Sequence, residues 1–440
     1  MTECKEYKRR WLMLLLFFLC STSNSMHWLQ YSIIANIMMR YYDVSSLAIN
    51  WTSIIYEACY MPFVFPASWL LQHKGLRITL ISGAAMMTVG SWIKALFASA
   101  EHFFAAFIGQ AVVGTAQIFI LGLPARLAAV WFPARQVSTA CSLGVFGNQV
   151  GVALSFLIPP IIVHNHDSLD DIGEDLSKLN YILAAGPTIM LILVLIFFEK
   201  EPPTPAQLSE ADKKQVEQTY LQSVKSLLTN KNFVLLFVSY GIIVGVYYAV
   251  STLLNQMVLL HFPGAEQDAG RIGLCMVLAG VLGLMTSGVI LDKTHKFKES
   301  TLIVYLVSLV AVLVFAFSFS TGMIWFTYFA AACMGFFMIG FLTIGYEFAA
   351  ELTYPIPEGT SSGILNFSGE VFGILLTLAE GQVLNYFGDM TTNIALACCL
   401  LVGLLLSMLI DGKDLRRQAA NTPEKNTTSV ATISTATTEF

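Results

Sequence analysis

The sequence has little charge for its length. Asp, Glu, Lys and Arg make up 12% of its 440 residues, whereas hydrophobic residues make up 56%. A soluble domain cannot bury so much apolar surface, so the composition indicates a protein whose main solvent is lipid. Little of the chain is left for a soluble domain.

The chain also lacks the common signatures of catalysis. No G-x-S-x-G, H-E-x-x-H or phosphate-binding glycine loop occurs in it, so we expect no enzyme activity, no cofactor and no nucleotide-binding domain. Any driving force for movement of a ligand would then be a gradient. Nucleic acid is not an expected partner.

Cysteine pairs and metal-ligand spacings are missing as well. Of the eight cysteines, most fall inside apolar runs and none pairs in a predicted outer loop, so we expect no disulfide and no metal site. His164 and His166 lie in an acidic outer loop, which we interpret as solvated surface.

Long apolar runs recur at regular intervals along the chain. A membrane-spanning helix needs about 20 such residues, so the runs predict an all-α membrane protein with twelve transmembrane helices in two six-helix lobes. We place the spans at about 12–39, 51–71, 78–98, 104–131, 138–162, 180–199, 233–260, 271–291, 300–320, 324–350, 360–385 and 390–410.

Basic residues set the predicted orientation. Most of the 24 Lys and Arg fall on one side if both termini are cytosolic, as the positive-inside rule requires. The domains are then an N-terminal six-helix lobe (1–199), a cytosolic linker loop (200–232), a C-terminal six-helix lobe (233–410) and a disordered cytosolic tail (411–440). Within the linker, Ser209–Asp212 would cap an amphipathic surface helix.

The two halves resemble each other when one is shifted by about 220 residues. Trp28 then aligns with Tyr248, and Asn148 with Glu370. Such a repeat is typical of two-lobed transporters, whose binding site lies between the lobes. An aromatic side chain on the first span of each half indicates an aromatic cage, which suits a small organic cation.

Glu370 and Gln117 are the next candidates. An acid inside the eleventh span is costly unless it is paired, protonated or solvated, so Glu370 could neutralise an ammonium group, carry a proton, or form a structural hydrogen bond as a protonated carboxyl. Gln117 could bond a substrate hydroxyl or amine, or simply join helices. Trp28 and Tyr248 could likewise serve only in the packing of helices.

Other polar residues are secondary candidates. We interpret Glu57 and Lys94, in adjacent spans, as a structural ion pair. Near the inner ends of the fourth and tenth spans, Arg126, Glu347 and Glu351 could form an inner gate. The cavity between the lobes could further be lined by His27, Asn24, Asn148, Gln149 and Ser251.

Several segments carry a family resemblance, among them Trp28–Ile34, Gln117–Pro124, Val250–Gln256 and Glu358–Gly363. Together they closely resemble one family, the feline leukaemia virus subgroup C receptor-related transporters of the major facilitator superfamily. The resemblance implies a monomer that moves choline and ethanolamine across the plasma membrane by alternating access, with intracellular membranes as a further location. An older assignment of this family is haem transport.

The resemblance also implies site residues. The cage aromatics of the family fall on Trp28 and Tyr248, and its polar substrate residues fall on Gln117 and Asn255. Glu370 stands where the family has Gln, so a carboxylate here should strengthen cation binding or add pH dependence. Two alternatives remain open: a haem exporter or importer, and a membrane sensor that binds choline lipids without moving them.

Overall fold

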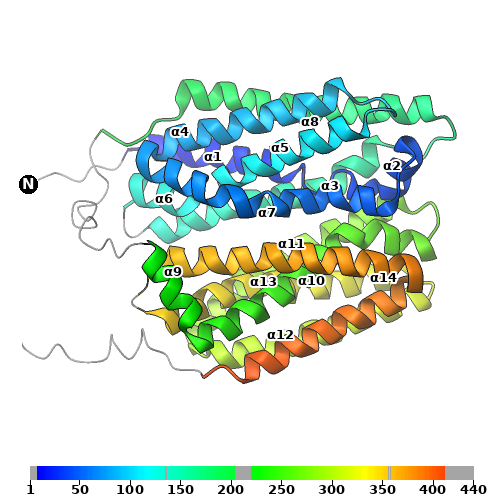
Figure 1. Cartoon of the computed structure of the whole chain (residues 1–440). Helices are drawn as coiled ribbons and strands as arrows, with labels where there is room; N and C mark the ends of the chain where they lie inside the picture. The colour runs from blue at the N-terminus through cyan, green and yellow to red at the C-terminus, as the bar shows by residue number, and fades with distance from the viewer. Residues whose placement is uncertain (1–6, 134–135, 204–219, 355, 357, 412–440) are drawn as a thin grey trace, which may run out of the picture.

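The computed structural model describes residues 7–133, 136–203, 220–354, 356 and 358–411. Their helices form two layers, one from each half of the chain (Figure 1). The N-terminal lobe contains α1 (Arg9–Ser25), the short 3₁₀ helix η1 (Ser32–Ile34), α2 (Ala35–Tyr42), α3 (Ser46–Ala58), α4 (Tyr60–Leu96), α5 (Phe103–Leu121), α6 (Leu123–Trp131), α7 (Val137–Ile162) and α8 (Leu169–Phe197).

The C-terminal lobe follows α9 (Tyr220–Thr229), which lies at the same end of the molecule as the start of α1 (Figure 1). It contains α10 (Lys231–His261), α11 (Glu266–Thr294), α12 (Phe297–Ser320), α13 (Ile324–Thr353) and α14 (Glu358–Met408). We call the end with α9 the inner end, and the opposite end, with α2, the outer end. The predicted cap at Ser209–Asp212 and the predicted disordered tail beyond Asp411 lie outside the described residues.

Ten helical stretches of the described chain are long and apolar enough to cross a membrane. The first predicted span is absent from these because it is broken: α1 ends at Ser25, and turns connect it to η1 and α2. The last stretch, Gly359–Met408, has 50 residues and bends at Gly388 (φ 81°), so it is long enough to cross twice. When the broken first span is counted as one crossing and the last stretch as two, the structure accounts for the twelve predicted crossings.

Positive φ angles recur at matching positions of the two halves. Asp43 (φ 51°) and Gly264 (φ 80°) end the first segment of each lobe, and Gly75 (φ 79°) and His295 (φ 51°) lie in the turn between its second and third spans. Left-handed backbone is uncommon outside glycine. Its recurrence about 220 residues apart therefore supports the internal repeat in the sequence.

The lobes meet mainly along two helix pairs, α3 with α14 and α7 with α11. Within the C-terminal lobe, α10 packs mainly against α14, and α11 against α13. This arrangement leaves the middles of α3, α5, α7, α10 and α14 facing the interface between the lobes. Polar side chains on those helices therefore have a common place to gather.

Candidate functional site

A cavity lies between the lobes, with a volume of about 70 Å³. A single water needs about 10–15 Å³ measured in the same way, so the space can hold several waters or one small organic group. Its polar lining comes from both halves of the chain: Trp28, Glu57, Gln117, Asn148 and Gln149 from the N-terminal lobe, and Tyr248 and Glu370 from the C-terminal lobe. Apolar side chains, among them Val244 and Met338, complete the wall.

Trp28 and Tyr248, the repeat-related aromatic residues, meet in this cavity. Their ring centroids are 5.0 Å apart and the ring planes are inclined by 68°, an edge-to-face contact. Trp28 is 8% exposed and Tyr248 is partly buried. The structure thus brings together two aromatic residues that are 220 positions apart in the sequence, one from each lobe.

Trp28 projects from the break in the first span. The break needs hydrogen-bond partners, because irregular backbone at membrane depth is tolerated only where its polar groups are satisfied. Gln110 of α5 provides them: its Nε2 donates to the carbonyl oxygen of His27 at 2.6 Å and to that of Trp28 at 3.4 Å. Gln110 therefore fixes the backbone that carries the Trp28 ring.

Behind this break lies a buried polar cluster centred on Lys94. The Lys94 ammonium is 2.9 Å from His27 Nδ1 and donates to Gln30 Oε1 and Gln110 Oε1, both at 2.9 Å. Lys94 is 1% exposed. The predicted ion pair between Lys94 and Glu57 is therefore wrong, because Lys94 on α4 points into the N-terminal lobe and Glu57 on α3 points toward the other lobe.

Glu57 is a cavity residue that the sequence analysis did not identify as one. It is 3% exposed, and neither carboxylate oxygen has a hydrogen-bond partner in the described part of the chain. The indole N–H of Trp28 is the donor group beside Glu57, but the geometry between them is not that of a hydrogen bond. The carboxylate of Glu370 also faces Glu57. Glu57 could have been found by the criterion applied to Glu370, since both are isolated acids in apolar spans.

Glu370 lies on α14, is 6% exposed and lines the cavity. Its repeat mate, Asn148 on α7, lines the same cavity and accepts a hydrogen bond from Ser25 Oγ at 2.7 Å. Gln117 and Gln149 are partly buried and also line it. Four predicted polar residues therefore converge with the aromatic pair.

Four other candidates lie away from this lining. His27 belongs to the Lys94 cluster. Asn24 donates from Nδ2 to the Val113 carbonyl oxygen at 3.3 Å, and Ser251 is 1% exposed within α10. The polar character of these residues in predicted spans made them candidates for the lining, but Asn24 in α1 and His27 just after it both contact other helices of the N-terminal lobe.

Asn255 is the fourth candidate that lies away from the cavity lining. It has no exposed surface and connects the lobes above the cavity: its Nδ2 donates to the Ile33 carbonyl oxygen at 2.8 Å, and its Oδ1 accepts from the backbone N–H of Asn36 at 3.4 Å. Its amide is thus used at the interface between η1, α2 and α10 rather than in the cavity. Asn255 is not among the residues that line the cavity in this structure, and the substrate contact that the resemblance implies stays a prediction.

Further hydrogen bonds join the lobes toward the outer end. Asn36 Nδ2 donates to Glu266 Oε1 at 2.9 Å, and Gln256 Nε2 donates to Asn50 Oδ1 at 2.6 Å. Together with Asn255, these bonds close the outer end of the interface over the cavity.

The three predicted gate residues lie toward the inner end. Arg126 is in α6, and Glu347 and Glu351 are in α13. Glu351 is 9% exposed, with Oε2 unbonded in the described part of the chain. Their role as a gate stays a prediction.

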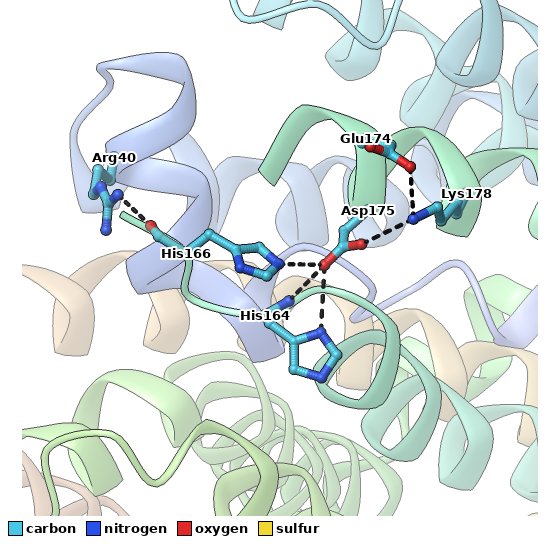
Figure 2. Close-up of polar contacts among 6 residues, drawn as sticks. All are labelled: Arg40, His164, His166, Glu174, Asp175 and Lys178. Atoms are coloured by element: carbon cyan, nitrogen blue, oxygen red, sulfur yellow. Dashed lines mark hydrogen bonds and ion pairs between the residues drawn. The ribbon is translucent and has the colours of Figure 1, made fainter. Parts of the chain in front are cut away.

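A separate polar cluster lies in the loop before α8 at the outer end (Figure 2). Asp175 Oδ2 lies 2.9 Å from His166 Nε2 and 3.3 Å from His164 Nδ1, and Lys178 bonds Glu174 and Asp175 from the same helix. Two imidazoles and a carboxylate are possible metal ligands. Here both rings point at one carboxylate oxygen, so hydrogen bonding explains the arrangement and the cluster fastens the loop to α8.

Comparison with known proteins agrees with this fold. The sequence profile of the Major Facilitator Superfamily matches residues 13–378. A bacterial homologue of the human lysosomal transporter Spinster, solved in an inward-facing and unoccupied conformation, superimposes with a TM-score of 0.69 over 94% of this chain and 96% of its own, at 14% identity. The chain is therefore a multi-pass membrane transporter of the major facilitator superfamily, and not an enzyme.

Close relatives define the family within this class. The zebrafish (Danio rerio) choline/ethanolamine transporter flvcr2a is 46% identical over 423 residues, which cover 96% of this chain and 90% of the relative. The human (Homo sapiens) choline/ethanolamine transporter FLVCR2 is 45% identical over 420 residues, covering 95% and 80%. The chain belongs to the feline leukaemia virus subgroup C receptor-related family, as the sequence motifs indicated.

Proposed function

We propose that this transporter carries choline, with ethanolamine as a second substrate, across the plasma membrane by alternating access. The observation that carries the proposal is the contact of Trp28 with Tyr248 across the lobe interface, beside two buried carboxylates. Aromatic faces and carboxylates attract a quaternary ammonium group. The relatives named as choline/ethanolamine transporters support the same substrate class.

Each part of the cavity matches one part of choline. The rings of Trp28 and Tyr248 would hold the trimethylammonium group, an interaction worth about 2 kcal/mol per ring once water is excluded. Because the two rings touch, a cation bound between them must first separate them. Glu370 would balance the positive charge, and the side-chain amide of Gln117 would bond the hydroxyl end.

Alternating access has a structural basis in the position of the site. Both lobes line the cavity, and side-chain hydrogen bonds such as that from Asn255 to the Ile33 carbonyl oxygen hold the lobes together on its outer side. Breaking those bonds while forming contacts at the inner end would expose the same site to the opposite face. We assign both termini to the cytosol because Lys and Arg gather at the inner end.

Labelled-choline uptake by cells expressing the chain tests the proposal. A double variant, Trp28→Ala with Tyr248→Ala, should lose most uptake while still reaching the cell surface, since up to about 2 kcal/mol per ring would be lost. Trp325→Ala with Tyr386→Ala is the matched control, because both side chains are 78% exposed.

Normal choline uptake by the double variant, with surface expression measured, would contradict the aromatic site. Absence of choline uptake by the unaltered chain would contradict the substrate. In that case a haem absorption band on the purified protein would favour haem transport, and choline binding without flux would favour a sensor.

A further inference from the structure

Glu57 and Glu370 bring two carboxylates to one cavity, from opposite lobes. Glu57 comes from α3 and Glu370 from α14, and the side chains are 3% and 6% exposed. Gly373, about one turn beyond Glu370, makes room for the approach, because a Cβ at that position would lie 2.5 Å from Glu57 Oε2. Both oxygens of Glu57 lack a hydrogen-bond partner in the described part of the chain.

Among the residues that the structure describes, the groups around the two carboxylates do not supply a balancing cation. Lys94 is the buried cation on a neighbouring helix, and it is held by His27, Gln30 and Gln110 on the far side of the Trp28 backbone. The titratable side chains that face the pair are phenols, which are neutral at ordinary pH. They are Tyr240 and Tyr248 of α10 and Tyr346 of α13, together with Tyr247 of α10, which lines the same cavity.

Charge balance therefore needs two positive charges from outside the protein side chains. A buried carboxylate without a partner is strongly disfavoured in a membrane protein. One choline supplies one charge, so the loaded site would be neutral with one choline and one proton. The unloaded site would be neutral with two protons, and the two forms would differ by the exchange of one proton for one cation.

Resting on choline as the proposed substrate, we propose that this transporter exchanges one organic cation for one proton at the Glu57–Glu370 pair. When choline enters the cavity, one carboxyl O–H bond breaks and the proton leaves to the compartment that the cavity faces. The carboxylate left behind balances the ammonium charge, and the other carboxyl keeps its proton. On the opposite face the steps reverse, so a proton returns as choline leaves.

The location of the carboxylates in different lobes makes the exchange obligatory. Closing the lobes brings Glu57 against α14 near Glu370, and two ionised groups there would repel each other across the interface. The transporter can then change state only when protons or a cation have neutralised the pair. A transporter without this device would move choline alone.

Purified protein in liposomes tests the exchange. Potassium with valinomycin holds the membrane potential at zero, a pH-sensitive dye fills the lumen, and labelled choline is present outside. One-for-one exchange predicts that a lumen one pH unit more acidic than the medium accumulates choline about tenfold, since one pH unit and a tenfold concentration ratio have the same free energy. Choline entry should also make the lumen more alkaline.

Variants connect the coupling to the pair. Choline should only equilibrate, at a ratio near one and without a dye response, in the double variant Glu57→Gln with Glu370→Gln. Glu380→Gln is the matched control: Glu380 is a buried carboxyl of the same helix, 4% exposed, and lies away from the residues that line the cavity. It should keep the tenfold ratio.

The wild-type ratio decides the proposal even if the double variant fails to fold. Choline that equilibrates at a ratio near one despite the pH gradient would overturn proton exchange and leave choline transport intact. Accumulation that follows a sodium gradient would overturn it in favour of a metal cation. Absence of choline entry into wild-type liposomes would overturn the substrate and the exchange together.

Discussion

Glu57 of the N-terminal lobe lies against Gly373 of the C-terminal lobe, at a point where any side chain on α14 would intrude. A Cβ on Gly373 would be 2.5 Å from Glu57 Oε2 and 2.6 Å from Tyr248 Cδ2. The glycine thus allows a carboxylate of one lobe and an aromatic ring of the other to share the same wall of the cavity. The closed interface depends on the absence of a single methyl group.

Gly373→Ala should therefore impair transport. The added methyl group must displace Glu57 or Tyr248, and overpacking of this kind costs about 1–3 kcal/mol. We expect choline uptake to fall severalfold or more with surface expression retained. Gly363→Ala on the same helix is the control, because nothing lies within 4 Å of a Cβ there. Equal uptake by the two variants would show that the contact has no role.

Much of the architecture could be predicted from the sequence, because membrane spans depend on long apolar runs and the repeat preserves the spacing between halves. Trp28, Tyr248 and Glu370 were identified in the same way, by position within a span. Helix rotation was not predictable. Glu57 and Lys94 lie at similar depth in adjacent spans, and only the packing of α3 against α14 shows that they face different environments.

The broken first span explains the remaining differences. The first predicted span covers about 12–39, whereas α1 ends at Ser25 and turns follow it. The break changes the direction of every side chain beyond it. His27 therefore belongs to the Lys94 cluster, and its polar character alone did not reveal which way it would face.

Gln110→Ala should weaken substrate binding without removing any cavity residue. The variant loses the donor to the His27 and Trp28 carbonyl oxygens and one acceptor for Lys94. Unsatisfied buried polar groups cost about 1–3 kcal/mol each, and the Trp28 backbone would lose its support. We expect the KM for choline to rise more than the maximal rate falls.

The control for this variant is Gln267→Ala, an exposed glutamine on α11 whose side chain bonds only Arg271 among the contacts described. It should match the unaltered chain in KM. If Gln110→Ala lowers the amount of protein and the maximal rate but leaves KM unchanged, Gln110 supports folding and not the position of Trp28.

Asn255→Ala should loosen the outer closure while leaving the cavity lining intact. Two hydrogen bonds between the lobes are lost, each worth about 0.5–1.5 kcal/mol. The population open to the outside should increase severalfold. A cysteine introduced at Ser53, which bonds Thr252 across the interface at 2.8 Å, should then react faster with a thiol reagent added outside.

Asn393→Ala is the comparison for the closure experiment. Asn393 is as buried as Asn255, but its amide donates within α14 to the Asp389 carbonyl oxygen at 2.9 Å. It should leave the reactivity of the introduced cysteine unchanged. A large loss of choline affinity in Asn255→Ala with no change in cysteine reactivity would instead assign Asn255 to the substrate.

The last prediction concerns pH and the two cavity acids. Protons and choline compete for the Glu57–Glu370 pair in the proposed exchange, so choline uptake from the outside should decline as the external pH falls from about 8 to 6. Only one of the two carboxyls loses its proton in the proposed exchange, so Glu57→Gln still has one acid, Glu370, that can release a proton when choline binds. Uptake by this variant should therefore still decline as the external pH falls, whereas uptake by the double variant Glu57→Gln with Glu370→Gln should no longer depend on pH. A decline in the double variant that parallels the unaltered chain would mean that the competing proton binds elsewhere.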